Sequence, residues 1–336
     1  MTAFHDLAHA TLGNTTAGIV TVLLAVSVSL SARAAEPQFR IGVIQSESVV
    51  VFERVQKGFA DAMANSGFTE RVNVSYDIQT TGSSALKERE IARKFAAAGI
   101  TLIHSIGTRP TQAMIRESSI PVVFSAVTDP MGAGIVPITS PPETPTGTNV
   151  TGVSDATPIR VQLEVFSRLA PKARKWGAIY NPAEPNSVFI MEELRRSARH
   201  LQFELIEVTV ASGDEVPDAV AALAGKGVEA LFKPADSTVS ASFKALVAGC
   251  DARQIALFTG GNGATRGALA SYGVDHYLVG YAAGKKAALI LKGNKAGTIP
   301  WGNVDKFDLV INLRAAKAQG ITVPAEMLRL ADRVIP

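Results

Sequence analysis

Short apolar runs rich in β-branched residues alternate with amphipathic stretches along most of the chain. Apolar residues at positions 51, 55, 59, 62 and 63 fall on one helical face, and Gly67 follows where that helix should end. The same pattern predicts strands at 41–45, 72–78, 102–106, 122–127, 150–153, 176–180, 204–210, 230–233 and 255–258. It predicts further helices at about 82–98, 112–117, 159–169, 188–200, 219–223 and 239–248.

Strands that alternate with helices indicate βαβ units, and therefore parallel sheets covered by helices on both faces. The alternation is interrupted by a proline-rich segment at 139–148 and starts again after the strand at 150–153. Two rounds of alternation predict an α/β protein with two domains, and 336 residues are enough for both. Ligands of open α/β sheets bind at the carboxyl ends of strands, so the residues after each strand are the candidates for a site.

The N-terminal segment has the features of an export signal. Residues 19–30 form a run of 12 without a charge, which is shorter than the roughly 20 residues of a membrane-spanning helix. Ala32-Arg33-Ala34 follows as a small-x-small cleavage pattern. We predict a signal peptide over 1–34 and a mature protein free in the periplasm, although no Lys or Arg precedes the apolar run. The alternative is an N-terminal core helix.

Composition excludes several classes of protein. The net charge of +3 is too small for a dedicated nucleic-acid binder. Cys250 is the only cysteine, which excludes an internal disulfide framework and a multi-cysteine metal site, and we predict that it is a buried small apolar residue. We expect that the mature protein does not bind nucleic acid and has no membrane-spanning segment.

Catalytic and cofactor motifs are missing from the sequence. His104, His200 and His276 have no metal-like spacing, and neither a G-x-S-x-G elbow nor a phosphate-binding P-loop is present. The glycines at 260–263 lack the spacing of a dinucleotide site. We therefore expect a non-enzyme without metal or cofactor. The alternative is an exported enzyme that uses Asp129 and Asp236 as an acid/base pair.

Several segments carry a family resemblance in chain order: 41–59 (IGVIQSESVVVFERVQKGF), 125–136 (SAVTDPMGAGIV), 149–155 (NVTGVSD), 267–284 (GALASYGVDHYLVGYAAG), 311–324 (INLRAAKAQGITVP) and 331–336 (ADRVIP). Together they resemble the ABC-transporter substrate-binding family whose best-known members bind tryptophan and other aromatic amino acids. The resemblance implies a type I periplasmic binding protein fold, in which two Rossmann-like lobes joined by three crossover strands close on a ligand at the hinge. We expect lobes at 35–155 plus about 272–296, and at 156–271 plus about 297–336.

The resemblance also implies function. We expect a monomeric extracytoplasmic component of an ABC importer that captures a small polar or zwitterionic solute and delivers it to the membrane permease and its ATPase. Where the family often has a Glu-His-Pro-type segment, this chain has Ser48-Val49-Val50. This departure lies beside the expected ligand cleft and argues against an aromatic ligand, so the expected ligand class is amino-acid-like solutes in general, of which aromatic amino acids are one kind. The alternative is a ligand-sensing subunit for a receptor kinase. The sequence does not separate the two roles, because docking surfaces carry no motif.

Carried over by position, the resemblance places ligand contacts at the strand ends of both lobes. The candidates are Gln45, Ser46, Thr108, Thr128, Asp129, Asn181, Asn186, Ser187, Asp236 and Asp275. Helix-start N–H groups near Thr108 and Thr128 would hold a carboxylate, and Asp129, Asp236 or Asp275 an ammonium group. Stacking on a flat ligand would come from Tyr180, Phe189, Phe258 or Tyr272. Helix capping is the competing explanation for each polar candidate.

Overall fold

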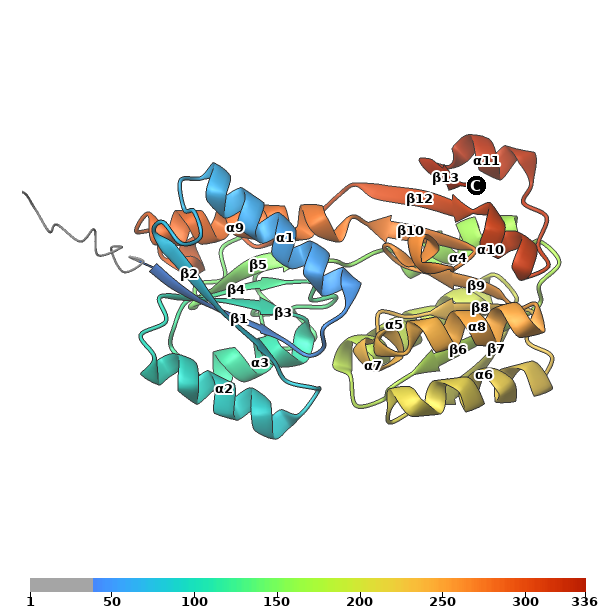
Figure 1. Cartoon of the computed structure of the whole chain (residues 1–336), viewed down its shortest axis with the longest axis horizontal. Helices are drawn as coiled ribbons and strands as arrows, with labels where there is room; N and C mark the ends of the chain where they lie inside the picture. The colour runs from blue at the N-terminus through green and yellow to red at the C-terminus, as the bar shows by residue number, and fades with distance from the viewer. Residues whose placement is uncertain (1–38) are drawn as a thin grey trace, which may run out of the picture. The chain divides into compact units, whose positions relative to one another are not determined.

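The computed structural model describes residues 39–336, and the predicted signal peptide at 1–34 lies outside them. Two sheets organise the described chain, each with helices on both faces (Figure 1). The first sheet has the order β11-β5-β4-β3-β1-β2 and is parallel throughout. The prediction of two α/β lobes with parallel sheets is confirmed.

The first lobe is built from the following elements. Its strands are β1 (Phe39–Gln45), β2 (Val74–Thr80), β3 (Leu102–Ile106), β4 (Val122–Ser125), β5 (Val150–Ser154) and β11 (Gly302–Asn303). Its helices are α1 (Val50–Asn65), α2 (Ala85–Ala97), α3 (Thr108–Glu117) and α9 (His276–Leu291), with a 3-10 turn η3 (Ala296–Thr298). The proline-rich segment 139–148 is a loop, as predicted.

The second sheet has the order β13-β12-β10-β9-β8-β6-β7 and is parallel except for the antiparallel pair β10–β12. Its strands are β6 (Lys175–Tyr180), β7 (Glu204–Thr209), β8 (Ala230–Lys233), β9 (Ala256–Thr259), β10 (Ala270–Val274), β12 (Phe307–Asn312) and β13 (Arg333–Ile335). Its helices are α4 (Ile159–Leu169), α5 (Pro185–His200), α6 (Val216–Gly225), α7 (Ser237–Ala241), α8 (Phe243–Arg253), α10 (Leu313–Ala318) and α11 (Ala325–Leu330), with 3-10 turns η1 (Gly213–Glu215) and η2 (Gly263–Arg266).

Several element boundaries differ from the sequence prediction, among them those of α3, β4 and the helix predicted at 239–248. Helix α3 begins at Thr108 and not at residue 112, because the chain turns into it directly at Gly107, whose φ of 92° suits glycine. Strand β4 ends at Ser125, because Ala126 has a left-handed φ of 52° and turns the chain out of the sheet. The helix predicted at 239–248 is two helices, α7 and α8, separated at Ser242.

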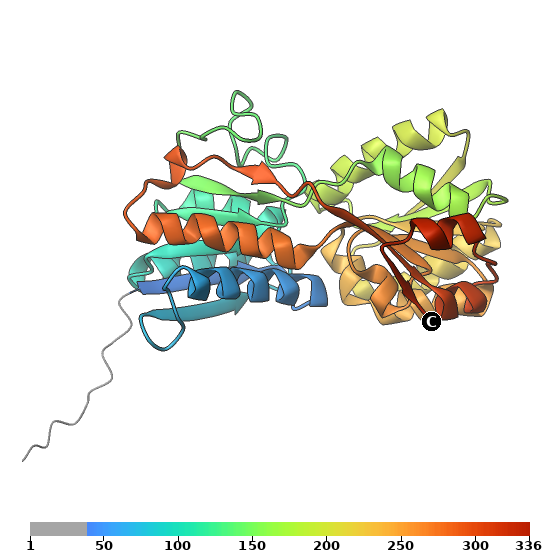
Figure 2. The same cartoon turned by 90° about the horizontal axis from the view of Figure 1, so that it is seen from above.

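The chain passes between the two sheets three times, after β5, after β10 and after β11 (Figure 2). Because β11 pairs with β5, the chain stays with the first sheet until Asn303, beyond the change of lobe expected near 296. The passages after β5 and β10 bring Asp155 and His276 to the boundary between the lobes.

Side chains of β1 fill the core on both faces of the first sheet. Ile41 and Val43 pack under α1 and α9, whereas Ile44 packs with α2 and α3 on the other face. On the α1 side, the ring of Phe59 stacks on His104 at a centroid distance of 3.8 Å. Burial of both faces explains why these strands are nearly continuous apolar runs.

Helices α1 and α9 approach closely because glycines line their contact. An added Cβ at Gly280 would lie 1.9 Å from the carbonyl oxygen of Val55, and one at Gly58 would lie 2.0 Å from that of Tyr277. Only the absence of a Cβ permits this backbone contact. The contact fixes α9, and with it His276, on the first lobe although its sequence follows a strand of the second.

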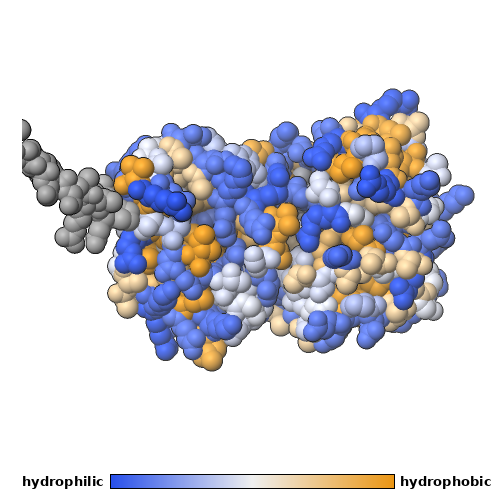
Figure 3. Space-filling view, viewed as in Figure 1, coloured by the Kyte–Doolittle hydropathy of each residue, from blue (hydrophilic) through white to orange (hydrophobic). Residues whose placement is uncertain are grey.

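Apolar residues on the viewed surface form small separate patches among polar ones (Figure 3). Ile138 and Val72 are among the exposed large apolar residues, and their dispersion is ordinary for a protein surface. Across residues 39–336, the helices are all too short or too polar to cross a membrane. Cys250 is free and buried, as predicted, and burial raises the pKa of its thiol to about 12.

Candidate functional site

A cavity lies where the carboxyl ends of the strands of both lobes face each other. The cavity has a volume of about 120 Å³, and residues of both lobes line it. The first lobe contributes the starts of α1, α3 and α9 and the turn after β4, and the second contributes α4, α5 and the segments after β8 and β9. This position agrees with the strand-end rule for α/β proteins.

The N-terminus of α3 faces this cavity without a side-chain cap. Gly107 is the N-cap residue and has no side chain to accept from the first turn, and both Gly107 and Thr108 line the cavity. The N–H groups of a first turn have no partners inside their own helix and carry the positive end of the helix dipole. An anionic group in the cavity is therefore stabilised at this position.

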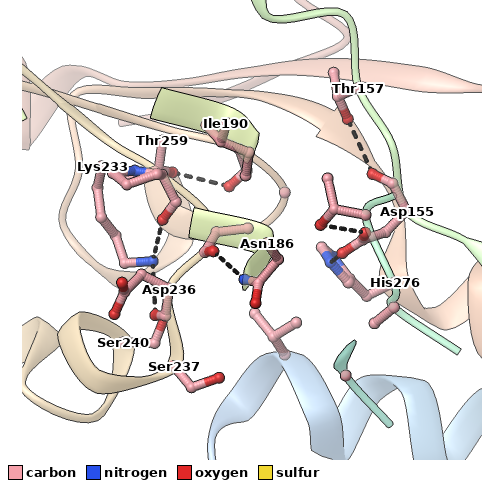
Figure 4. Close-up of a pocket in the computed structure, with 18 of the residues that line it drawn as sticks. Asp155, Thr157, Asn186, Ile190, Lys233, Asp236, Ser237, Ser240, Thr259 and His276 are labelled. Carbon is pink, nitrogen blue, oxygen red and sulfur yellow. Dashed lines mark hydrogen bonds and ion pairs between the residues drawn. The ribbon is translucent and has the colours of Figure 1, made fainter. Parts of the chain in front are cut away.

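Asp155, directly after β5, supplies a carboxylate to the same cavity. Its Oδ1 accepts a hydrogen bond from Thr128 Oγ1 at 3.0 Å, and its Oδ2 lies 3.4 Å from Nε2 of His276. Figure 4 shows Asp155 and His276 together on one side of the cavity, opposite Lys233 and Asp236. Within residues 39–336, no Lys or Arg forms an ion pair with Asp155, so its charge is available to a cationic ligand group.

Apolar side chains complete the walls. Phe52 and Val49 come from the start of α1 in the first lobe, and Ile190 and Phe232 come from α5 and β8 in the second. Their apolar surface suits the side chain of a ligand more than its charged groups. The cavity therefore combines an anion-binding helix end, a carboxylate and an apolar wall.

A buried polar network forms the corner between β8 and α7. Glu184 accepts from the N–H groups of Ser237 and Thr238 at 2.8 and 2.9 Å, and burial raises its pKa. The ammonium group of Lys233 donates to the carbonyl oxygen of Pro234 at 2.8 Å, and burial lowers its pKa to about 8 despite the neighbouring Asp236 and Glu184. The carboxylate of Glu184 and the ammonium group of Lys233 therefore both have hydrogen-bond partners within this corner.

Three buried polar atoms of cavity-lining residues have no hydrogen-bond partner in the described part of the chain. They are the Thr108 hydroxyl, Oε1 of Gln162 and Nδ1 of His276. An unsatisfied buried polar group costs about 1–3 kcal/mol. Their convergence on one cavity indicates a place where a polar ligand completes the hydrogen bonding.

The structure brings four of the ten predicted site residues to the cavity. They are Thr108, Thr128, Asn186 and Asp236. The six others do not line it: Gln45, Ser46, Asp129, Asn181, Ser187 and Asp275.

Both Asp129 and Asp275 use their carboxylates as caps. Asp129 Oδ1 accepts from the N–H of Gly132 at 2.9 Å in the turn that follows it. Asp275 accepts from the N–H of Tyr277 at the start of α9 and pairs with Arg54 at 2.6 Å. Burial opposes ionisation of Asp275, but these hydrogen bonds outweigh it and hold its pKa below the ordinary value.

Asp236 lines the cavity, but its oxygens are occupied by the protein. Oδ1 accepts from the N–H of Val239 as the cap of α7, and Oδ2 accepts from the N–H of Asn181 and the hydroxyl of Ser187, both at 2.7 Å. The expectation that Asp129 or Asp236 holds an ammonium group, and the alternative that the two act as an acid/base pair, are therefore not supported by the geometry. Capping, the competing explanation, describes both.

Ser46 contacts the opposite lobe. Its hydroxyl donates to the Ser237 hydroxyl at 3.1 Å, from the end of β1 to the start of α7. Gln45, one residue earlier, bonds inside its own lobe to Thr80 and Gln56. Residue 46 therefore contributes to the contact between the lobes.

Sequence reasoning missed Asp155, Gln162 and His276. Asp155 follows β5 just as Asp129 and Asp236 follow their strands, so the strand-end rule applied there too would have found it. Gln162 is a polar residue on the apolar face of α4, between Ile159 and Leu163, and this position is a signal in itself.

The proposed stacking residues lie elsewhere. The side chains predicted to stack on a flat ligand, Tyr180, Phe189, Phe258 and Tyr272, belong to the core of the second lobe or pack against it. Phe52 and Phe232 are the aromatic residues that line the cavity. Among residues 39–336, no cluster of three or more His, Cys, Asp or Glu is placed to hold a metal ion.

Comparison with known proteins shows similarity over nearly all of the described chain. A family model described as ABC transporter substrate binding protein matches residues 40–335. A tyrosine-binding protein from Clostridioides difficile (strain R20291) is 32% identical over 283 residues, which are 84% of this chain and 81% of that protein.

Two solved structures share the fold at similar identity. The ABC domain in complex with L-Trp from Streptococcus pneumonia is 29% identical, with a TM-score of 0.83 over 89% of this chain and 100% of that chain. The ligand-free, open structure of a substrate binding protein with adhesive properties from Clostridium difficile is also 29% identical, with a TM-score of 0.65 over 88% of this chain and 99% of that chain. The two lobes and three crossings are those of the type I periplasmic binding protein fold.

Proposed function

Because the chain belongs to the family of ABC transporter substrate binding proteins, we propose that it captures an amino acid, with aromatic amino acids preferred, outside the cytoplasm and delivers it to a membrane permease. The observation that carries the proposal is that an uncapped helix N-terminus and a carboxylate without a Lys or Arg partner in residues 39–336 face one cavity. A positive and a negative site in one cavity are the requirements for holding a zwitterion.

The main-chain end of the ligand binds the first lobe in this proposal. The N–H groups of the first turn of α3 and the Thr108 hydroxyl donate hydrogen bonds to the α-carboxylate, and Asp155 accepts hydrogen bonds from the α-ammonium group. Both partners belong to the first lobe, so the side chain of the ligand projects toward Ile190 and Phe232 of the second. The similarity to a tyrosine-binding protein and to a structure in complex with L-Trp supports an aromatic side chain there.

Closure around the hinge accompanies binding. At equal sequence identity, the chain is more similar to the L-Trp complex than to the ligand-free, open relative, and a hydrogen bond joins Ser46 to Ser237 across the lobes. A ligand that touches both lobes gains its full contacts only in the closed state, and so shifts the population toward it. Solution scattering should show a smaller radius of gyration with saturating ligand. An unchanged profile, with binding measured separately, would overturn closure.

Calorimetry on the purified protein, refolded to remove carried-over ligand, tests the ligand class. We expect L-Trp and L-Tyr to bind, L-Ala to bind much more weakly for lack of an apolar side chain, and tryptamine and indole-3-propionate to lose affinity because each lacks one charged group. Saturable binding of a sugar, with no binding of any amino acid, would refute the proposal.

Delivery and export are tested in cells. The alternative of a sensory subunit predicts that deleting the gene leaves uptake of the identified amino acid unchanged and abolishes a transcriptional response to it. Transport predicts reduced uptake. We further propose that the mature protein begins near Ala35, and N-terminal sequencing of the periplasmic fraction checks this position.

A further inference from the structure

Gln162 is a polar residue inside the apolar part of the cavity wall. It lies on the buried face of α4 with Ile159 and Leu163 and is 2% exposed. Its Nε2 donates to the carbonyl oxygen of Tyr272 at 2.6 Å. A carbonyl oxygen only accepts, so this bond fixes which arm of the amide is nitrogen and leaves Oε1 as the other arm.

Oε1 of Gln162 has no hydrogen-bond partner within residues 39–336, and Gln162 lines the cavity. The amide lies beside Gly260, since an added Cβ at Gly260 would be 3.3 Å from Nε2 of Gln162, and Gly260 also lines the cavity. The amide oxygen is therefore an acceptor held in position, and a donor supplied by a ligand would satisfy it.

The surroundings of Gln162 determine which kind of donor fits. Ile159, Ile190 and Phe232 line the second-lobe side of the same cavity. A charged ammonium group loses more hydration in an apolar environment than a neutral donor does, and Asp155 already offers it a carboxylate on the first lobe. A neutral N–H or O–H on the ligand's side chain matches Gln162 better.

We propose that Gln162 is a specificity-determining residue that selects, among amino acids, those whose aromatic side chain carries an N–H or O–H donor, as an indole or a phenol does. This inference rests on the proposed function, because it assumes that the main-chain end of the ligand binds Thr108 and Asp155. A phenyl ring of similar size leaves the amide oxygen unsatisfied and binds less tightly.

The test compares L-Trp with β-(3-benzothienyl)-L-alanine, in which sulfur replaces the indole N–H while the shape is nearly kept. The wild-type protein should bind L-Trp about 5- to 150-fold more tightly, the range that one unsatisfied buried acceptor produces. The variant Gln162→Met keeps an unbranched side chain and removes the amide. Its affinities for the two ligands should lie within about threefold of each other, because neither ligand then leaves a buried acceptor unsatisfied.

A matched control is Gln112→Met. Gln112 also donates from Nε2 to a backbone carbonyl, that of Ala133 at 2.8 Å, but it does not line the cavity. This variant should keep the wild-type preference, and thermal melts should show all three proteins folded. The wild-type comparison alone decides the inference if Gln162→Met does not fold.

Two results overturn the inference while leaving the proposed function intact: equal binding of both ligands to the wild type, or an equal loss of affinity for both in Gln162→Met. The second result would place Gln162 against the common main-chain end. If the wild type binds neither ligand, the proposed function and the inference fail together.

Discussion

Replacing Asp155 by Asn should weaken amino-acid binding while leaving the fold in place. The substitution keeps the size of the side chain and an oxygen for the hydrogen bond from Thr128, but it removes the negative charge. Asp155 has no Lys or Arg partner within residues 39–336, so the protein itself loses no strong ion pair. The ligand's ammonium group loses a charge-assisted hydrogen bond, which contributes about 1.5–3 kcal/mol. The dissociation constant for L-Trp should rise by about 10- to 150-fold.

Calorimetry with two ligands isolates this effect. Indole-3-propionate lacks the ammonium group, so wild type and Asp155→Asn should bind it with similar affinity. Asp129→Asn is the matched variant, because Asp129 lies in the turn after β4 in the same lobe, but its carboxylate caps the Gly132 N–H outside the cavity. It should bind L-Trp like the wild type and keep its unfolding free energy close to that of the wild type, because the Asn side chain still offers an acceptor oxygen to the Gly132 N–H. The reasoning is refuted if Asp155→Asn binds L-Trp like the wild type, or if it weakens indole-3-propionate by the same factor.

Three further predictions concern stability and closure. Burial lowers the pKa of His104 to about 3, so only the unfolded chain binds a proton there as the pH falls below 6.5. The free energy of unfolding should therefore fall by about 2 kcal/mol between pH 7 and 5. In urea melts, His104→Phe should lack this loss, and an unchanged pH dependence would contradict the assignment. Gly280→Ala should lower the free energy of unfolding by about 1–3 kcal/mol because its Cβ meets a carbonyl of α1, whereas Gly225→Ala, with open space around it, should be neutral or stabilising. Equal melting temperatures of the two variants would argue against the close contact. Ser46→Ala should weaken ligand binding by about 2- to 12-fold through the lost contact with Ser237, and adding Ser237→Ala should weaken it no further; additive losses would count against a shared bond.

The sequence by itself determined the class of the fold. In the first lobe, runs such as 41–45 and 102–106 predicted the buried parallel strands directly, because strands covered on both faces must be apolar throughout. The pattern predicted none of the elements after residue 258. Strand β10 is five residues long and contains a glycine, and α9 has apolar and small residues on most of its circumference, so neither shows a clear period. Their places depend on packing, and in α9 on the glycine contact with α1.

The sequence also indicated where a site should be, but not which side chains face it. The strand-end rule selected the correct edge, and Thr108, Thr128, Asn186 and Asp236 line the cavity. An aspartate that follows a strand can bind a ligand or cap the next turn, and the sequence around it does not distinguish these two roles. Tertiary structure decided between these roles. Asp129, Asp236 and Asp275 have backbone N–H groups within reach and cap them, whereas Asp155 lies at a crossing between lobes, where no helix begins directly after it and its carboxylate stays with the cavity.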